Sequence, residues 1–158
     1  MKKKVLIVLG SGGHTAQMLR LLKLLGDRYE YEYVVNDDDT TTNKKIDGKI
    51  YKLHRAREIG DSKLHILSNG LKNIPISFNI IRKVKPYAII SAGPGLTIPL
   101  FIFGKVFGTK TIFIETWARA NSKSLTGKIC YPMSDLFFVQ WPKMKKHYKK
   151  AIYVGRLG

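Results

Sequence analysis

Short apolar runs alternate along the chain with longer segments in which apolar residues recur at helical spacing. The run Val5–Leu9 is uncharged and rich in β-branched residues, which is typical of a strand buried on both faces. From Thr15 to Leu25, leucine and methionine recur at helical spacing with polar residues between them, which predicts an amphipathic helix. The chain therefore opens on a strand followed by a helix.

The same alternation continues toward the C-terminal end. Further strands are predicted over Tyr31–Asn36, Lys49–His54, Tyr87–Ser91, Lys110–Glu115, Asp135–Gln140 and Ala151–Gly155. Helices are predicted over Ser62–Pro86, where Pro75 marks a break or kink, and over Leu96–Phe107, Leu125–Pro132 and Pro142–Lys150. Strands separated by helices predict a single Rossmann-like α/β domain over residues 1–158, with a mostly parallel, doubly wound sheet.

The turn between the first strand and the first helix has the sequence GSGGHT, residues 10–15. In doubly wound sheets ligands bind beyond the carboxyl ends of the strands, where this turn lies. The start of a helix directs unpaired backbone N–H groups outward, and its dipole adds partial positive charge there. We therefore predict a phosphate cradle made of Ser11, Gly12, Gly13, His14 and Thr15; a turn used only for close packing is the alternative.

This turn differs from two well-known phosphate-binding motifs. Thr15 stands where the dinucleotide fingerprint has a third glycine or alanine, and the GK[ST] ending of a Walker loop is absent. Asp37–Asp39 follow the second strand, about where an acid would bind the ribose of a nicotinamide dinucleotide. A nicotinamide-dependent enzyme therefore stays open as an alternative.

Candidate chemistry gathers at the same edge of the sheet. Gly93 and Gly95 lie in a second strand-to-helix turn, which packs against the first turn or offers further N–H groups to an anion. Glu115 ends an apolar strand, where a carboxylate either pairs with Arg119 or a lysine or faces a cleft and contacts a sugar hydroxyl. His14 lies beside a positive helix end, which favours a neutral imidazole suited to general base catalysis; capping the turn is its alternative role.

The charge balance predicts an anionic partner. Lysine and arginine number 28 against 11 acidic residues, a formal net charge of +17. Five lysines near two aromatic residues, Trp141 and Tyr148, favour a membrane surface, with apolar contact from Ile74–Lys85 and Leu96–Phe107. These lysines are Lys143, Lys145, Lys146, Lys149 and Lys150. The sequence contains no aromatic platform or module typical of RNA binding and no apolar run that would span a bilayer, so we expect peripheral attachment and no nucleic acid.

Cysteine and histidine usage gives no sign of a metal site. Cys130 is the single cysteine, which excludes a disulfide framework and a cysteine-rich metal site and fits a reducing compartment. His54, His65 and His147 show no ligand spacing with one another or with acidic residues. We therefore predict neither a metal site nor a disulfide.

Three stretches of the chain together resemble a known family. They are GSGGHTAQMLRL, ISAGPGLTIPLFIFGKVFGTKTIFIETWAR and SLTGKICYPMSDLFFVQWPKMKKHY. They are similar to PssD-type proteins of capsule and exopolysaccharide synthesis, relatives of the membrane-anchoring subunit of the eukaryotic transferase that adds the second GlcNAc to dolichyl-diphosphate-GlcNAc. The chain also resembles the N-terminal half of MurG, a GT-B glycosyltransferase that adds GlcNAc to a polyprenyl-diphosphate-linked sugar.

This resemblance implies the acceptor-binding half of a GT-B enzyme, active only together with a small donor-binding catalytic subunit. No cofactor is implied, and the UDP-sugar co-substrate would lie mainly on the partner. Ser11–Thr15, Gly93 and Gly95 would hold the diphosphate of a polyprenyl-diphosphate-linked sugar, and His14 matches a histidine proposed as base in MurG.

Glu115 would be a second catalytic candidate. The reaction would be an inverting, metal-independent transfer at the cytoplasmic face of the membrane. A scaffold subunit without catalytic residues, which only recruits the partner, is the alternative.

Overall fold

The computed structural model describes residues 2–40, 42, 45–55 and 63–157, and the side chains of 63–67 are not described. Its centre is a six-stranded, wholly parallel sheet with the order β3-β2-β1-β4-β5-β6. The strands are β1 (Lys4–Val8), β2 (Glu30–Asn36), β3 (Lys49–Leu53), β4 (Ala88–Ser91), β5 (Lys110–Ile114) and β6 (Leu136–Phe138). From β1 to β3 the strands are added toward one edge of the sheet, and from β4 to β6 toward the other, so the strand order reverses between β1 and β4. This reversal confirms the predicted doubly wound, Rossmann-like fold.

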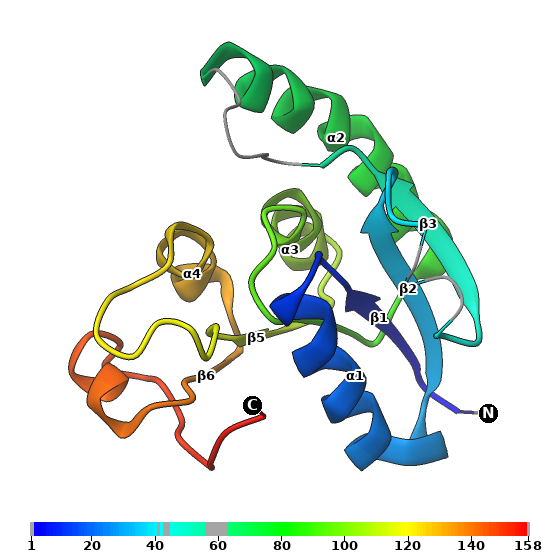
Figure 1. Cartoon of the computed structure of the whole chain (residues 1–158). Coiled ribbons are helices and arrows are strands. Elements are labelled where there is room, and N and C mark those ends of the chain that lie inside the picture. Colours follow the sequence, from blue (N-terminus) through cyan, green and yellow to red (C-terminus); the bar gives the residue numbers. More distant parts are fainter. Residues whose placement is uncertain (1, 41, 43–44, 56–62, 158) are drawn as a thin grey trace.

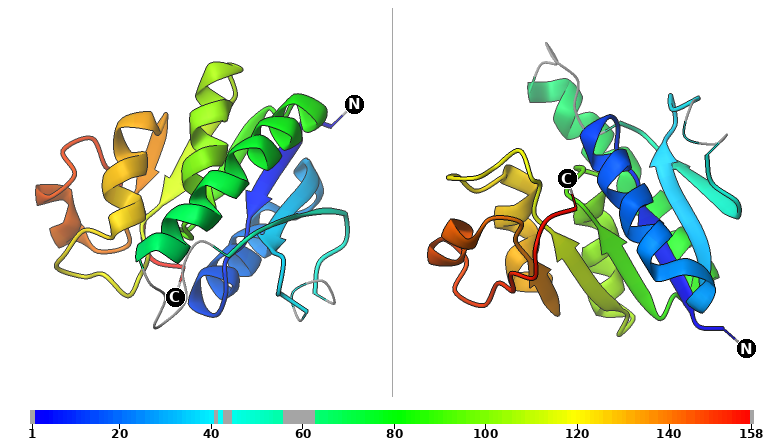
Figure 2. Two further views of the ribbon diagram at one scale, coloured as in Figure 1. Left: turned by 90° about the horizontal axis from the view of Figure 1, so that it is seen from above. Right: turned by 60° about the horizontal axis from the view of Figure 1, so that its bottom comes forward.

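The helices cover the two faces of the sheet unequally. The long helix α2 (Lys63–Val84), α3 (Thr97–Val106) and α4 (Leu125–Cys130) lie on one face, and α1 (Gly13–Leu25) lies on the other (Figures 1 and 2). Because successive side chains of a strand point to opposite faces, Leu6 and Val8 belong to one core cluster, and Val5 and Ile7 to the other. Because both faces of β1 are buried, nearly every residue in this strand is apolar.

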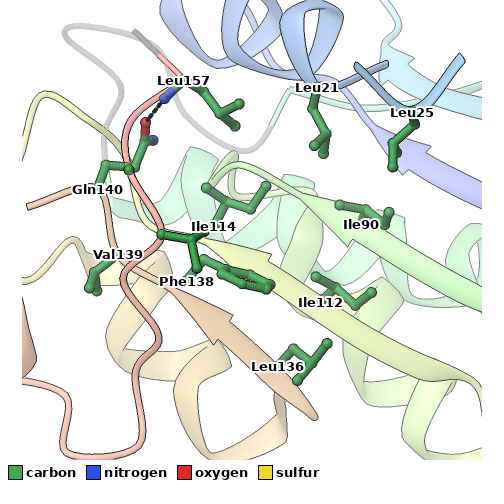
Figure 3. A pocket seen from close by; sticks show the side chains of 12 residues that line it. Leu21, Leu25, Ile90, Ile112, Ile114, Leu136, Phe138, Val139, Gln140 and Leu157 are labelled. Carbon is green, nitrogen blue, oxygen red and sulfur yellow. Dashed lines mark hydrogen bonds between the residues drawn. The ribbon is translucent and has the colours of Figure 1, made fainter. Parts of the chain in front are cut away.

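On the α1 face, β4, β5 and β6 are crossed by the C-terminal segment 152–157 rather than by a helix among the described residues (Figure 2). An apolar pocket of about 310 Å³ lies there, with Leu21 and Leu25 of α1 on one side (Figure 3). The segment is held by Leu157, whose N–H donates to Gln140 Oε1 at 2.8 Å. Ile90, Ile112 and Leu136 line the strand side of this pocket.

Two sequence predictions about individual elements are wrong, and a third is narrowed. Of the break or kink expected at Pro75, the break is absent, because helix α2 runs through this residue. Pro75 and Leu71 are both exposed, so the proline ring and the Leu71 carbonyl, which has no N–H partner at Pro75, face solvent. The lysine-rich segment forms only a 3₁₀ turn, Pro142–Lys146, since closely spaced lysines repel one another in a helix. The expected last strand is reduced to one bridge between Ile152 and Phe138. Ser62, the expected start of α2, lies outside the described residues.

Candidate functional site

The two glycine-rich turns meet at the carboxyl ends of β1 and β4, which are neighbours at the centre of the sheet. In the first turn Gly12 has φ +57°, a conformation that favours glycine, and it offers no capping side chain to α1. Ala16 is the first residue of α1 whose N–H donates to a helical carbonyl, that of Gly12. The N–H groups of Gly13, His14 and Thr15 therefore emerge at the open end of the helix.

This helix start is accessible to a ligand. Ser11, Gly12 and Gly13 are exposed, His14 is half-buried, and Thr15 is buried with its hydroxyl donating to the Gly10 carbonyl at 2.8 Å. Thr15 thus fastens the turn from inside, while the residues before it leave the N–H groups open to solvent. Such an arrangement is suited to binding a phosphate or diphosphate.

His14 joins the first turn to the second. Its Nδ1 lies 2.6 Å from the Ala92 carbonyl oxygen. Because a carbonyl oxygen only accepts hydrogen bonds, Nδ1 carries the proton, and the lone pair of the neutral ring is on Nε2. The hydrogen bond therefore fixes the tautomer that a general base needs.

The second turn is shaped around this imidazole. Gly93 has φ +108°, and a Cβ added to it would lie 3.3 Å from His14 Cε1. At Gly10 a Cβ would lie 2.8 Å from Pro94 Cβ, so the two turns are in direct contact. Close packing between the turns, one of the two roles considered for Gly93, is therefore confirmed.

A pocket of about 540 Å³ is lined both by these turns and by side chains of the helices α2, α3 and α4. Gly10, Ser11, His14, Gly93 and Gly95 line its polar part. Side chains of α2, α3 and α4 line its apolar part: Ile74, Ile98, Ile102 and Leu125. A ligand that fits this pocket combines an anionic group with an apolar group.

Glu115 is buried, with 1% of its surface exposed, and its carboxylate is fully engaged. It accepts hydrogen bonds from the Tyr148 hydroxyl at 2.7 Å, the Thr116 N–H at 3.0 Å and the Ser124 N–H at 3.3 Å. The expected partner Arg119 instead donates to the Ser122 hydroxyl. This geometry does not support proton abstraction by Glu115; it gives the carboxylate the task of holding the loop 116–124.

The surroundings of Glu115 are tightly packed. A Cβ on Gly127 would lie 2.3 Å from Glu115 Oε2. Burial, together with the nearby Glu115 carboxylate, raises the pKa of the Cys130 thiol to about 12. Cys130 is thus an inert buried side chain, as expected of a cysteine that serves as a small apolar residue.

The loop that Glu115 holds carries Trp117 next to the start of α1. The Gln17 amide oxygen accepts from the Trp117 indole N–H at 2.7 Å and from its backbone N–H at 3.1 Å, the orientation that satisfies both groups. The Trp141 indole N–H donates to the Trp117 carbonyl at 2.7 Å. Sequence reasoning missed Trp117, and it assigned Tyr148 to a membrane surface, whereas Tyr148 is buried.

The five lysines of the 143–150 segment are all exposed, but their aromatic neighbours do not accompany them to the surface. Tyr148 is buried, and the Trp141 ring is covered by Arg156, whose guanidinium carbon lies 4.6 Å from the ring centroid. The prediction that Tyr148 lies at a membrane surface beside these lysines is therefore wrong.

In the part of the chain that the structure describes, six exposed apolar side chains lie on the helices α2, α3 and α4, on one face of the sheet. They are Leu71 and Ile74 of α2, Ile102 and Val106 of α3, and Leu125 and Ile129 of α4, here called the apolar helix surface. Among the described helices, none is both long and apolar enough to cross a bilayer. In the same part of the chain, no cluster of three His, Cys, Asp or Glu side chains is placed to hold a metal ion.

The acids that suggested a nicotinamide dinucleotide have other partners. Asp37 Oδ2 lies 2.7 Å from His54 Nδ1, and Asp38 Oδ2 lies 2.6 Å from Arg55 Nη2. The loop after β2 is thus tied to the residues that follow β3. This pairing gives no support to a ribose-binding role for Asp37 or Asp38.

Solved structures show the same fold. MurG of Acinetobacter baumannii superposes with a TM-score of 0.74 at 14% identity, over 89% of this chain and 42% of that one. UDP-N-acetylglucosamine 2-epimerase from Rickettsia bellii gives a TM-score of 0.76 at 11% identity, over 99% of this chain and 46% of that one. The chain thus has the fold of one half of these larger proteins, as in GT-B glycosyltransferases such as MurG.

Sequence relatives are more specific. The UDP-N-acetylglucosamine transferase subunit ALG14 of Rattus norvegicus is 33% identical, over 97% of this chain and 82% of that protein. The Schizosaccharomyces pombe subunit alg14 is 35% identical, over 98% of this chain and 83% of that protein. Residues 5–157 match the family described as "Oligosaccharide biosynthesis protein Alg14 like". With that match over nearly the whole chain, the protein belongs to the Alg14 family of glycosyltransferase subunits.

Proposed function

We propose that this chain is the acceptor-binding subunit of a two-subunit glycosyltransferase, which transfers a sugar from a UDP-sugar to a polyprenyl-diphosphate-linked sugar. The observation that carries the proposal is His14, whose Nε2 lone pair is made available by the Nδ1–H bond to Ala92 at one end of a pocket that becomes apolar at the other. The names of the ALG14 relatives supply UDP-N-acetylglucosamine as the donor that best fits.

Different parts of the acceptor bind to different parts of the pocket. Its diphosphate binds to the open N–H groups at Ser11–Thr15, with Gly93 and Gly95 on the other side, and the first isoprene units follow the apolar lining. The rest of the lipid stays in the bilayer, against which the apolar helix surface lies at the cytoplasmic face. Attachment is peripheral.

The transfer then needs one proton acceptor on this chain. As the acceptor hydroxyl oxygen bonds to the anomeric carbon of the donor, the bond from that carbon to the UDP oxygen breaks, with inversion. His14 Nε2 takes the proton that the hydroxyl loses, and UDP leaves on the partner subunit. Glu115 contributes by positioning the loop 116–124.

The direct test is reconstitution. The chain is co-expressed with a candidate donor-binding subunit, and transfer of labelled GlcNAc from UDP-GlcNAc to membrane lipid extracts is measured. We expect activity in the complex and little or none in either subunit alone. A chain that is inactive in the complex but binds a nicotinamide dinucleotide would contradict the proposal.

The partner subunit binds, in this proposal, to the apolar pocket on the α1 face of β4–β6. Leu136 of β6 and Val154 of the C-terminal segment are 42% and 78% exposed, which leaves apolar surface open beside Ile112 (Figure 3). A doubly wound sheet normally carries helices on both faces, and here this part of the sheet has none among the described residues. An apolar helix face of the donor-binding subunit therefore fits the gap.

This docking site predicts the effect of one charge. Leu136→Glu is expected to weaken binding of the donor-binding subunit at least tenfold, because a carboxylate would be buried against apolar side chains. The dissociation constant is measured by surface plasmon resonance. Leu24→Glu, at an exposed position of α1 outside the pocket, serves as the control and should bind normally. Equal affinity of the two variants would place the partner elsewhere.

A further inference from the structure

A second pocket, of about 350 Å³, lies at the edge of the sheet opposite the candidate site. It is formed where α2 and α3 end and where β4 and β5 begin, and its lining includes Arg82, Lys85, Tyr87, Phe107 and Lys110. Because the glycine-rich turns lie at the carboxyl ends of the strands, this pocket is separated from them by the length of the strands. The mechanism proposed above makes no use of it.

Positive charge surrounds the Tyr87 ring in this pocket. Lys3 Nζ lies 4.1 Å and Lys110 Nζ 5.4 Å from the ring centroid. A hydrogen bond with Lys110, together with the charges of Lys110 and Lys3, lowers the pKa of the Tyr87 hydroxyl. The pocket therefore has a positive potential that favours an anion.

The acidic residues nearby in the fold are already paired with other lysines. Glu32 and Glu30 lie 2.9 Å and 3.8 Å from Lys4 Nζ, and Asp135 lies 2.6 Å from Lys105 Nζ. Within the described part of the chain, Lys3, Arg82, Lys85 and Lys110 form no ion pair. Three of these cations line the pocket, the fourth, Lys3, lies over the Tyr87 ring, and no acidic residue is among the lining residues.

Lys85 occupies an unusual backbone position. It follows the last residue of α2 with φ +48°, a left-handed conformation in which glycine is strongly favoured, and Pro86 comes next. The neighbouring helix α3 is followed by Gly108 with φ +71°, the residue expected at such a position. Lysine in place of glycine at this position therefore carries backbone strain next to the basic pocket.

Apolar side chains connect this pocket to the apolar helix surface. Ile102 and Val106 form one stripe of α3 and are 44% and 71% exposed, and Phe107 at the pocket is 46% exposed. The ten residues of α3 span about 15 Å, so one flat surface can touch the candidate site's apolar lining and the basic pocket together. A membrane with anionic lipids offers an apolar layer for the α3 stripe and negative charge for the basic pocket.

We propose that this basic pocket binds the phosphate headgroup of an anionic phospholipid while the α3 stripe rests at the boundary of headgroups and acyl chains. Arg82, Lys85 and Lys110 contact the phosphate, and the Tyr87 hydroxyl donates a hydrogen bond to it. The inference rests on the membrane attachment in the proposed function, but it does not depend on sugar transfer.

The test uses the full chain and Lys85→Gly. Vesicles of phosphatidylcholine alone are compared with vesicles containing equal parts of phosphatidylcholine and phosphatidylglycerol, and bound protein is measured by flotation. We expect Lys85→Gly to bind the anionic vesicles about fivefold more weakly and to leave binding to neutral vesicles unchanged. At the same time its Tm should rise by about 2–4 °C, because glycine relieves the backbone strain. Weaker binding by a more stable protein separates a binding role from damage to the fold.

Controls distinguish other sources of attraction. Lys23→Gln removes the same charge from α1, on the other face of the sheet, and should change binding less than twofold. If a variant with Lys145, Lys146, Lys149 and Lys150 replaced by glutamine loses anionic binding while Lys85→Gly keeps it, the inference is overturned.

Free glycerol 3-phosphate should compete only weakly; complete displacement at equal phosphate concentration would indicate a site for soluble phosphate and overturn a lipid site. Failure of the wild-type chain to bind any vesicle would overturn membrane attachment as well as this pocket. Transfer by the complex to a soluble short-chain acceptor tests the proposed reaction separately.

Discussion

Replacing His14 by alanine is expected to lower the turnover of the assembled transferase by about 10²–10⁴-fold, the usual contribution of a positioned general base. The variant removes the Nε2 lone pair that the hydrogen bond to Ala92 makes available. Turnover is measured with saturating UDP-sugar and acceptor in the reconstituted complex. Affinity for the donor-binding subunit should be unchanged, because His14 lies at the pocket of the glycine-rich turns rather than on the α1 face of β6.

The same experiment separates the two roles of His14. A base predicts a loss in kcat, whereas a ligand of the diphosphate predicts a higher KM for the acceptor at nearly normal kcat. His54→Ala removes a different histidine, one that pairs with Asp37, and should leave kcat within about twofold. Normal kcat and KM in His14→Ala would remove the residue from the mechanism.

Replacing Gly127 by alanine should destabilise the fold by about 3 kcal/mol, the upper part of the range for overpacking a filled interior. The added Cβ would lie 2.3 Å from Glu115 Oε2 and 2.7 Å from the Tyr148 hydroxyl. The carboxylate cannot move away without losing the hydrogen bonds from Thr116 and Ser124. The free energy of unfolding is measured by urea denaturation of the full chain.

Gly70→Ala provides the matched comparison. Gly70 also lies within a helix, but a Cβ there meets no atom within 4 Å. Because alanine is a better helix former than glycine, this variant should be as stable as the wild type or more stable by up to about 1 kcal/mol. Similar stabilities for the two alanine variants would show that the packing around Glu115 can relax.

The order of strands and helices could be predicted from the sequence because the signal is local. An uncharged run such as Val5–Leu9 and the periodic leucines after it report burial residue by residue. Pro75 does not break α2, contrary to one of the two effects expected of it, because the effect of a proline depends on which side of the helix meets solvent, and the residue type does not reveal that. The final strand failed for a related reason: pairing with β6 continues for only one bridge.

The site was predictable only in part. The glycine-rich turn and His14 lie in one stretch of six residues, and the parallel sheet brings the second turn beside them. The partners of individual side chains are distant in sequence: Ala92 is 78 residues from His14, and Tyr148 is 33 residues from Glu115. No periodicity encodes such pairs, so Tyr148 was assigned to a membrane surface although it belongs to the interior.

The bond between the His14 ring and the Ala92 carbonyl crosses the seam between β1 and β4, where the two halves of the sheet meet. In the proposed mechanism, this bond orients His14 Nε2 as proton acceptor, which requires β1 and β4 to be paired in register. A chain in which β1 and β4 have separated would consequently lose activity while its helices are still folded. The reactivity of His14 therefore depends on pairing of the two central strands.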